Sequence, residues 1–216
     1  MYPEQPGDRQ LRQHFGTLYI TLLSIVVALA IEALLDQVDS VIAGQSGAQL
    51  WVTGLQAVQF VLTASVFWWI AARWAIALPW RFGMLDGLGM FLMLVVLHFL
   101  SRTIGGDFDF WLMVFGGFVV FGGFVYRMNG RRALAFAEVS AVHQRAHLRC
   151  AAVFYVSGLS LAGAGSFVAA DGVSGQGQIA IVVGVIALTA IVAWLDNKVW
   201  RDALKDLEQD QTPTAC

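Results

Sequence analysis

The stretch WVTGLQAVQFVLTASVFWWIAA, residues 51–72, contains no Asp, Glu, Lys or Arg. An α-helix of roughly 20 apolar residues crosses a hydrocarbon layer about 30 Å thick. Lipid cannot hydrogen-bond a bare backbone, so a helix is the conformation that satisfies the peptide groups of such a run within a membrane. We therefore predict that residues 51–72 form a transmembrane helix.

The whole chain has the composition of a membrane protein. Of its 216 residues 58% are hydrophobic and only 13% are charged, and the mean hydropathy is +0.67. Soluble domains carry about 25% charged residues. The net charge of −2 is too small to indicate nucleic-acid binding. The expected fold class is all-α, and the expected partner is the lipid bilayer rather than a nucleic acid.

Five other apolar runs accompany the first. We predict six transmembrane helices, at about residues 15–35, 51–72, 82–101, 110–126, 150–170 and 179–195. The chain then divides into an N-terminal segment, a transmembrane domain and a polar tail, at residues 1–14, 15–197 and 198–216. The run 82–101 is the weakest, because its charge-free part, 87–100, is short and Asp86 has to lie at the interface. Whether this run crosses fully stays open.

The basic residues indicate the orientation. With the N-terminus inside, all but Arg102 of the 13 Lys and Arg residues fall on the inner side, as the positive-inside rule requires. Both termini are therefore expected in the cytoplasm, in a multi-pass protein of the inner (plasma) membrane, which we assign to a bacterium. The alternative of a signal peptide ending near Ala43 is disfavoured, because the apolar run is long and Glu32 precedes that site.

Polar residues recur along the first predicted helix. Thr17, Thr21, Ser24, Ala28 and Glu32 follow spacings of four, three, four and four, which places them on one face. One interpretation is a face that lines a pore or coordinates an ion, because an intramembrane carboxylate is costly unless it has a role. The other, which we favour, is a seam between helices with Glu32 reaching the outer interface.

A second polar stripe lies on residues 51–72. Thr53, Gln56, Gln59 and Thr63 share a face that drifts slightly around the helix. These side chains either hydrogen-bond across helices or line a hydrated path. The first interpretation is favoured, because polar side chains commonly join helices within membranes.

His98 and Arg102 lie four residues apart near the outer end of the third run, on one face. His98 is a candidate for a proton relay, or else a buried histidine bonded to a carbonyl group. The outer segments are acidic around Arg102, which would concentrate cations at a pore mouth. The simpler expectation is that Arg102 pairs with Asp107 or Glu32.

Two further patterns bear on packing and metal binding. The fourth run repeats Phe-Gly-Gly-Phe at residues 115–118 and 121–124, and the fifth is rich in small residues over 157–165, so we expect close packing between these two helices or between subunits. His143 and His147 are one helical turn apart but lack a third ligand, so no metal site is expected.

The sequence contains no catalytic, nucleotide-binding or paired-cysteine motif. We expect no enzyme activity and no cofactor. The leading hypothesis is a small oligomeric channel or transporter for an ion or small solute. Its candidate pathway residues are Thr21, Ser24, Glu32, Gln56, Gln59, His98 and Arg102. The alternative is a structural or accessory protein that binds another membrane protein. The sequence specifies neither a substrate nor the number of subunits.

Overall fold

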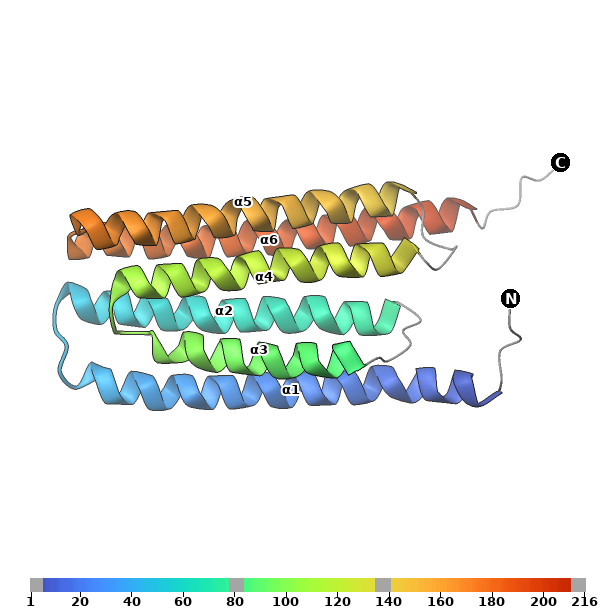
Figure 1. The fold of residues 1–216 in the computed structure, drawn as a ribbon, viewed down its shortest axis with the longest axis horizontal. Coiled ribbons are helices and arrows are strands. Elements are labelled where there is room, and N and C mark those ends of the chain that lie inside the picture. The colour runs from blue at the N-terminus through green and yellow to red at the C-terminus, as the bar shows by residue number, and fades with distance from the viewer. Residues whose placement is uncertain (1–5, 78–83, 135–140, 211–216) are drawn as a thin grey trace. The chain divides into compact units, whose positions relative to one another are not determined.

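The described part of the chain is entirely helical. The computed structural model describes the backbone of residues 6–77, 84–134 and 141–210, with side chains mainly within 16–75, 89–128 and 148–198. These residues form six α-helices and no strand (Figure 1). In chain order they are α1 (Pro6–Ile42), α2 (Ala48–Ala77), α3 (Met84–Arg102), α4 (Phe108–Leu134), α5 (Ala141–Asp171) and α6 (Gly175–Asp210). The expected all-α class is confirmed for these residues.

Five of the helices are long and apolar enough to cross a membrane. Their apolar stretches are Gly16–Ile42, Ala48–Arg73, Phe108–Met128, Leu148–Asp171 and Gly175–Lys198. They overlap five of the six predicted spans, which is compatible with an integral membrane protein. The described side chains of α3 supply a shorter apolar stretch, Phe91–Arg102. A crossing by α3 stays a prediction.

Several helices continue beyond the ends that hydropathy indicates, and α1 and α6 carry charged residues on these extensions. α1 runs past residue 35 to Ile42, so Asp36 and Asp39 lie on the helix rather than in a loop. α6 runs past residue 195 to Asp210, so the segment expected as a polar tail begins as helix. Neither extension contains Gly or Pro, the residues that usually end a helix. A charge ends an apolar run without ending the helix that carries it.

The chain divides into two compact units, each described by itself. The first comprises Met1–Phe108 and Val173–Val183, and the second comprises Asp109–Gly172 and Gly184–Cys216. In the first unit α1 packs against α2 and α3, and α2 also contacts α3. α1 and α3 run in the same direction, and α2 runs in the opposite one (Figure 1).

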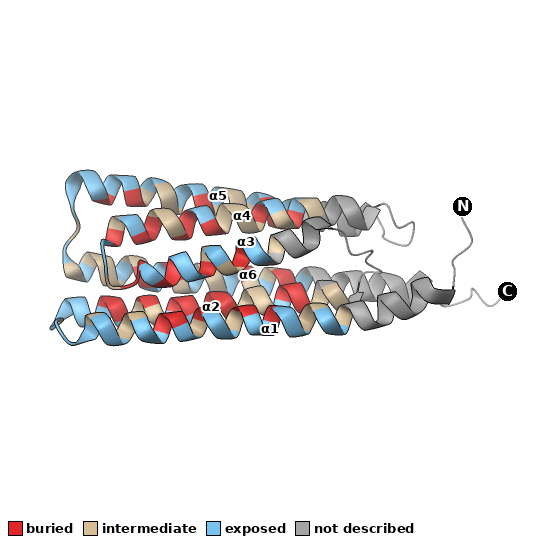
Figure 2. Cartoon of the chain, turned by 60° about the horizontal axis from the view of Figure 1, so that its bottom comes forward, coloured by how far each residue is buried: buried red, intermediate tan, exposed pale blue. Residues whose placement is uncertain are grey.

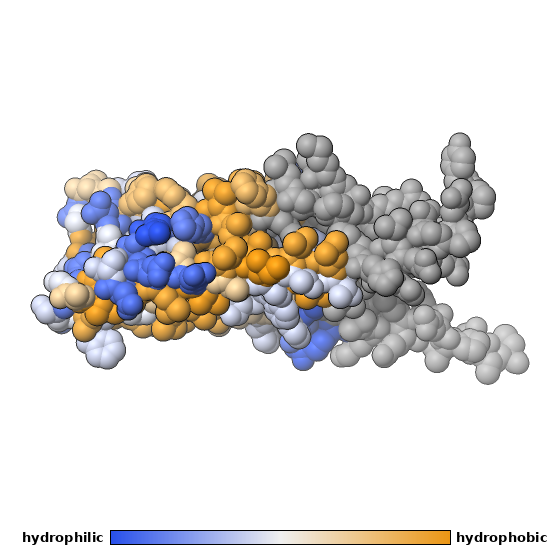
Figure 3. Space-filling view, turned by 90° about the horizontal axis from the view of Figure 1, so that it is seen from below, coloured by the Kyte–Doolittle hydropathy of each residue, from blue (hydrophilic) through white to orange (hydrophobic). Residues whose placement is uncertain are grey.

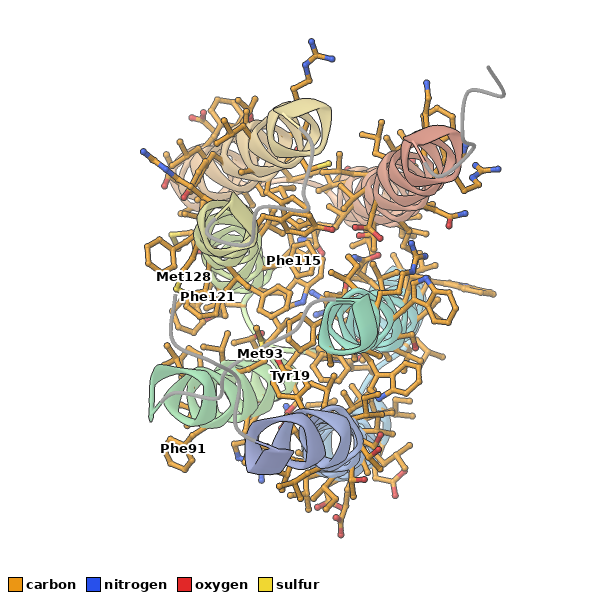
Figure 4. The ribbon with its side chains drawn as sticks, turned by 90° about the vertical axis from the view of Figure 1, so that its right-hand side faces the viewer. Tyr19, Phe91, Met93, Phe115, Phe121 and Met128 are labelled. Atoms are coloured by element: carbon orange, nitrogen blue, oxygen red, sulfur yellow. The ribbon has the colours of Figure 1, made fainter. Side chains whose placement is uncertain are left out.

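Apolar side chains fill the contacts within the first unit. Leu23 of α1 and Ala71 of α2 are buried together, and the ring of Tyr19 packs against them. Met93 lies on the buried side of α3, whereas Phe91 points away from the helices (Figure 4). Buried positions therefore recur along one side of each helix, while the other side is exposed (Figure 2).

In the second unit α4 and α5 meet along glycines. A Cβ atom placed on Gly116 would lie 2.6 Å from the backbone nitrogen of Ala162, and one on Gly158 would lie 2.7 Å from the carbonyl oxygen of Gly116. Such short distances leave no room for a side chain between the two backbones. The predicted close packing of these two small-residue segments is confirmed.

Candidate functional site

The polar stripe on α2 is buried. Thr53, Gln56 and Gln59 are at most 1% exposed, and Thr63 is 7% exposed. With a rise of about 1.5 Å per residue, the stripe covers about 15 Å of the helix. The predicted common face therefore exists, and it is turned into the protein.

Thr53 and Gln56, at the N-terminal end of this stripe, take part in the hydrogen bonds that hold the turn between α3 and α4. The N–H group of Gly105 donates a hydrogen bond of 3.0 Å to Oε1 of Gln56. Nε2 of Gln45 donates one of 3.2 Å to the carbonyl oxygen of Gly105. Oγ1 of Thr53 donates one of 2.7 Å to Oε1 of Gln45 and so orients that amide. Backbone groups outside regular structure need such partners where water is scarce.

A third glutamine holds the preceding residue of the turn. Nε2 of Gln37 on α1 donates a hydrogen bond of 3.1 Å to the carbonyl oxygen of Ile104, which is fully buried. Gly105 has a φ of +74°, and a Cβ atom there would lie 2.9 Å from Cγ2 of Val41. The turn is thus held by side-chain amides from both α1 and α2. At residue 105, the positive φ and the lack of room for a side chain both favour glycine.

Towards the C-terminal end of the stripe, Gln59 and Thr63 form a hydrogen bond within α2 itself. Nε2 of Gln59 donates a hydrogen bond of 2.9 Å to Oγ1 of Thr63, one turn further on. Nε2 of Gln56 is buried and has no hydrogen-bond partner among the described residues. The described hydrogen bonds of this stripe therefore belong to a packing contact. This contact joins the α3–α4 turn to α2 and does not join α2 to a helix beside it.

The stripe on α1 lies elsewhere. Thr21 and Ser24 are exposed, and their hydroxyl groups donate to the carbonyl oxygens of Thr17 and Ile20 on the same helix. Nε1 of Trp68 on α2 donates a hydrogen bond of 3.0 Å to Oγ of Ser24. Glu32 and the rest of this stripe are also exposed, whereas the stripe on α2 is buried. The described residues therefore do not bring the two stripes to one common cavity.

His98 and Arg102 are both exposed, so the interpretation of His98 as a buried histidine is wrong. Between them Ser101 is fully buried and donates a hydrogen bond of 2.7 Å to the carbonyl oxygen of His98. No ion pair joins Arg102 to Glu32 or Asp107 within the described chain, so the expected pairing is not found. Both basic side chains belong to the exposed surface of α3.

The second unit holds an ionisable pair that hydropathy did not indicate. Asp196 of α6 is only 2% exposed, and Oη of Tyr126 on α4 donates a hydrogen bond to its Oδ1. The ring of Tyr126 stacks on Phe154 of α5, with centroids 5.1 Å apart. The thiol of Cys150 on α5 is also buried and lies within electrostatic range of Asp196. Among the side chains that the structure describes, Asp196 is the only buried Asp or Glu.

Asp196 was missed because it begins the charged run after the sixth apolar stretch. The signal that identifies it is helical spacing. Val185, Val192 and Asp196 are buried at intervals of seven and four residues, so Asp196 continues the buried face of α6. A carboxyl group at a core position of a continuing helix is a candidate site rather than the start of a tail.

The described residues contain no group of three His, Cys, Asp or Glu side chains that would hold a metal ion. The side chains of His143 and His147, like Cys216, lie outside the described part of the chain. Comparison with protein families, with curated proteins and with solved structures finds no match. The function must therefore be argued from the sites themselves.

Proposed function

We propose that this protein moves a proton or a small cation across the membrane in which it lies, with Asp196 as a carboxylate of the pathway. The observation that carries the proposal is the burial of Asp196 within a membrane-length helix, where the hydroxyl group of Tyr126 holds it. Ionisable residues are rare inside membrane helices, and they mark ion pathways and proton relays.

The energetic argument compares Asp196 with a neutral alternative. A carboxylate buried among helices has to be paired, protonated or hydrated, whereas a neutral side chain does not carry this cost. An Asn has nearly the same shape and would also accept a hydrogen bond from Tyr126, without this cost. A carboxyl group at this place is therefore better explained by the charge that it can hold and exchange than by packing.

The same proposal includes six transmembrane spans, with both termini in the cytoplasm of a bacterial inner membrane. Two contacts support this orientation. The guanidinium group of Arg73 lies 4.7 Å from the ring centroid of Trp69, and Nζ of Lys198 lies 5.5 Å from that of Trp194. Half-exposed Trp residues beside basic residues are typical of a membrane–water interface, and basic residues favour the cytoplasmic side.

Single cysteines labelled in intact cells test the orientation. In a background without native cysteines, Asp39→Cys and Asp171→Cys should react with an impermeant maleimide added from outside. Arg127→Cys and Arg201→Cys should react only after the membrane is permeabilised. The reverse pattern, or mixed labelling within either pair, would overturn the orientation.

Flux measurements test the transport proposal. Purified protein in liposomes should dissipate a proton, sodium or potassium gradient faster than empty liposomes do. Asp196→Asn should lower this flux at least tenfold, because the amide cannot exchange a charge. Asp171→Asn is the matched control, since Asp171 is exposed at the end of α5, and it should leave the flux within a factor of two.

Two results would reject transport through Asp196. The first is a wild-type flux no higher than that of empty liposomes for all three cations. The second is an unchanged flux in Asp196→Asn protein that elutes from size exclusion like the wild type.

A structural or accessory role is the second candidate, and a specific observation favours it. The buried Gln56 amide on α2 is engaged in holding a turn, and the polar stripe on α1 is exposed, where a partner could contact it. Purification from native membranes in mild detergent separates the two proposals. A stoichiometric membrane-protein partner, together with no intrinsic flux, would support the accessory role.

A further inference from the structure

A mixed charged patch lies on the exposed surface of the first unit, near the α3–α4 turn. Its members are Glu32, Asp36 and Asp39 on α1 and His98 and Arg102 on α3. Apolar side chains flank it, including Leu35, which is 61% exposed, and Phe99, which is 51% exposed. The space-filling view shows this hydrophilic cluster set in a largely apolar face (Figure 3).

The acidic and basic members of the patch lie at matching depths. The hydrogen bond from Nε2 of Gln37 to the carbonyl oxygen of Ile104 places those two residues at similar levels. α1 and α3 run in the same direction (Figure 1), with a rise of about 1.5 Å per residue. Glu32 lies five residues before Gln37, while Arg102 and His98 lie two and six residues before Ile104. Glu32 is therefore close in depth to His98 and about one turn below Arg102.

Within one chain these charges do not pair. No ion pair joins Glu32 to His98 or Arg102 among the described residues, although the helices that carry them are neighbours. Glu32 lies within the apolar stretch Gly16–Ile42, one helical turn before Asp36. A carboxylate that faces lipid is costly unless an opposite charge or water reaches it.

We propose that a second copy of this chain covers the patch. A two-fold axis along the membrane normal keeps every residue at its own depth and sets α1 of one copy against α3 of the other. Glu32 then meets the partner's His98 and the partner's Arg102, and the symmetry makes the same contact twice. The flanking leucine and phenylalanine side chains supply the apolar part of the interface. This inference does not depend on transport, and it names the surface through which the chain would dimerise.

Cross-linking between two differently tagged copies tests the contact. Both copies lack native cysteines; one carries Glu32→Cys and the other Arg102→Cys. In membranes, a short bismaleimide should join the two tags in one covalent dimer. Leu18→Cys in place of Glu32→Cys is the matched control, because Leu18 is exposed on the same helix but lies about 21 Å deeper along it. The control pair should give at least tenfold less cross-linked product.

Charge exchange provides a second measurement. Glu32→Arg alone and Arg102→Glu alone should each lower the dimer fraction in nanodiscs at least fivefold. The double variant, which restores opposite charges across the interface, should return it to within a factor of two of the wild type. The proposal is overturned if no inter-tag product forms, if Leu18→Cys cross-links equally well, or if the double variant stays monomeric. A wild-type protein that stays monomeric in nanodiscs but still carries flux would overturn this inference and leave the transport proposal standing.

Discussion

The backbone N–H group of Gly105 donates a hydrogen bond of 3.0 Å to the side-chain oxygen Oε1 of Gln56. Gly105 belongs to the turn after α3, and Gln56 is 1% exposed on α2. A turn within an apolar bundle has few waters to satisfy its peptide groups, so a buried amide takes that role. These two residues, which are 49 positions apart in the chain, therefore depend on each other for stability.

Replacing Gly105 tests the conformation of this turn. Gly105→Ala should lower the free energy of unfolding by about 1–3 kcal/mol, since its φ of +74° disfavours a side chain and the new Cβ atom would lie 2.9 Å from Val41. Gly172→Ala is the control, because Gly172 has a φ of +70° in open space. Unfolding in mixed micelles, followed by tryptophan fluorescence, measures both. Equal losses would show that Val41 leaves room for the added methyl group.

Replacing Gln56 tests the hydrogen bond itself. Gln56→Leu leaves the partly buried N–H group of Gly105 without this acceptor, which should destabilise the protein by about 1–3 kcal/mol. Gln49→Leu makes the same change at an exposed position on α2 and should alter stability by less than about 0.5 kcal/mol. The same unfolding measurement applies. A Gln56→Leu protein as stable as the Gln49→Leu control would mean that the turn finds another partner.

The spacing of Thr53, Gln56, Gln59 and Thr63 was enough to predict one shared face on α2. Periodicity specifies which residues of a helix point the same way. It does not specify what they meet. The partner of Gln56 is a peptide group far along the chain, and only the packing of α1, α2 and α3 brings it there. The face was therefore predictable, and the contact was not.

The stripe on α1 and the carboxyl group of Asp196 also show that a sequence pattern does not predict burial. Thr21, Ser24 and Glu32 share a face as predicted, but that face is exposed, because spacing alone does not say which side of a helix packs. Hydropathy ended the sixth span at residue 195 and so left Asp196 just outside it, because a window average treats a charge as an end. Burial depends on neighbouring helices, and these are absent from a one-dimensional profile.

A double-mutant cycle on Tyr126 and Asp196 measures their interaction. Tyr126→Phe removes one charge-assisted hydrogen bond from the carboxyl group and should cost about 1.5–3 kcal/mol of stability. Asp196→Asn should weaken the same bond, so the double variant should lose less than the sum of the two single losses. The difference, measured by unfolding in mixed micelles, is the coupling free energy. A coupling free energy near zero would show that Tyr126 and Asp196 do not act as a unit.

The neighbouring glycines Gly116 and Gly117 isolate the packing of α4 on α5. A methyl group on Gly116 would lie 2.6 Å from both the backbone nitrogen of Ala162 and the carbonyl oxygen of Gly158, whereas nothing lies within 4 Å of one on Gly117. Gly116→Ala should therefore cost about 1–3 kcal/mol, because overpacking has to move two backbones apart. Gly117→Ala should be neutral or stabilising by up to about 1 kcal/mol, since Ala favours helix over Gly. Both changes add one methyl group to adjacent positions of one helix, so the gain in helix propensity is common to both. The difference between their unfolding free energies then measures the seam alone, and equal values would mean that α4 and α5 stand further apart than the glycine contacts require.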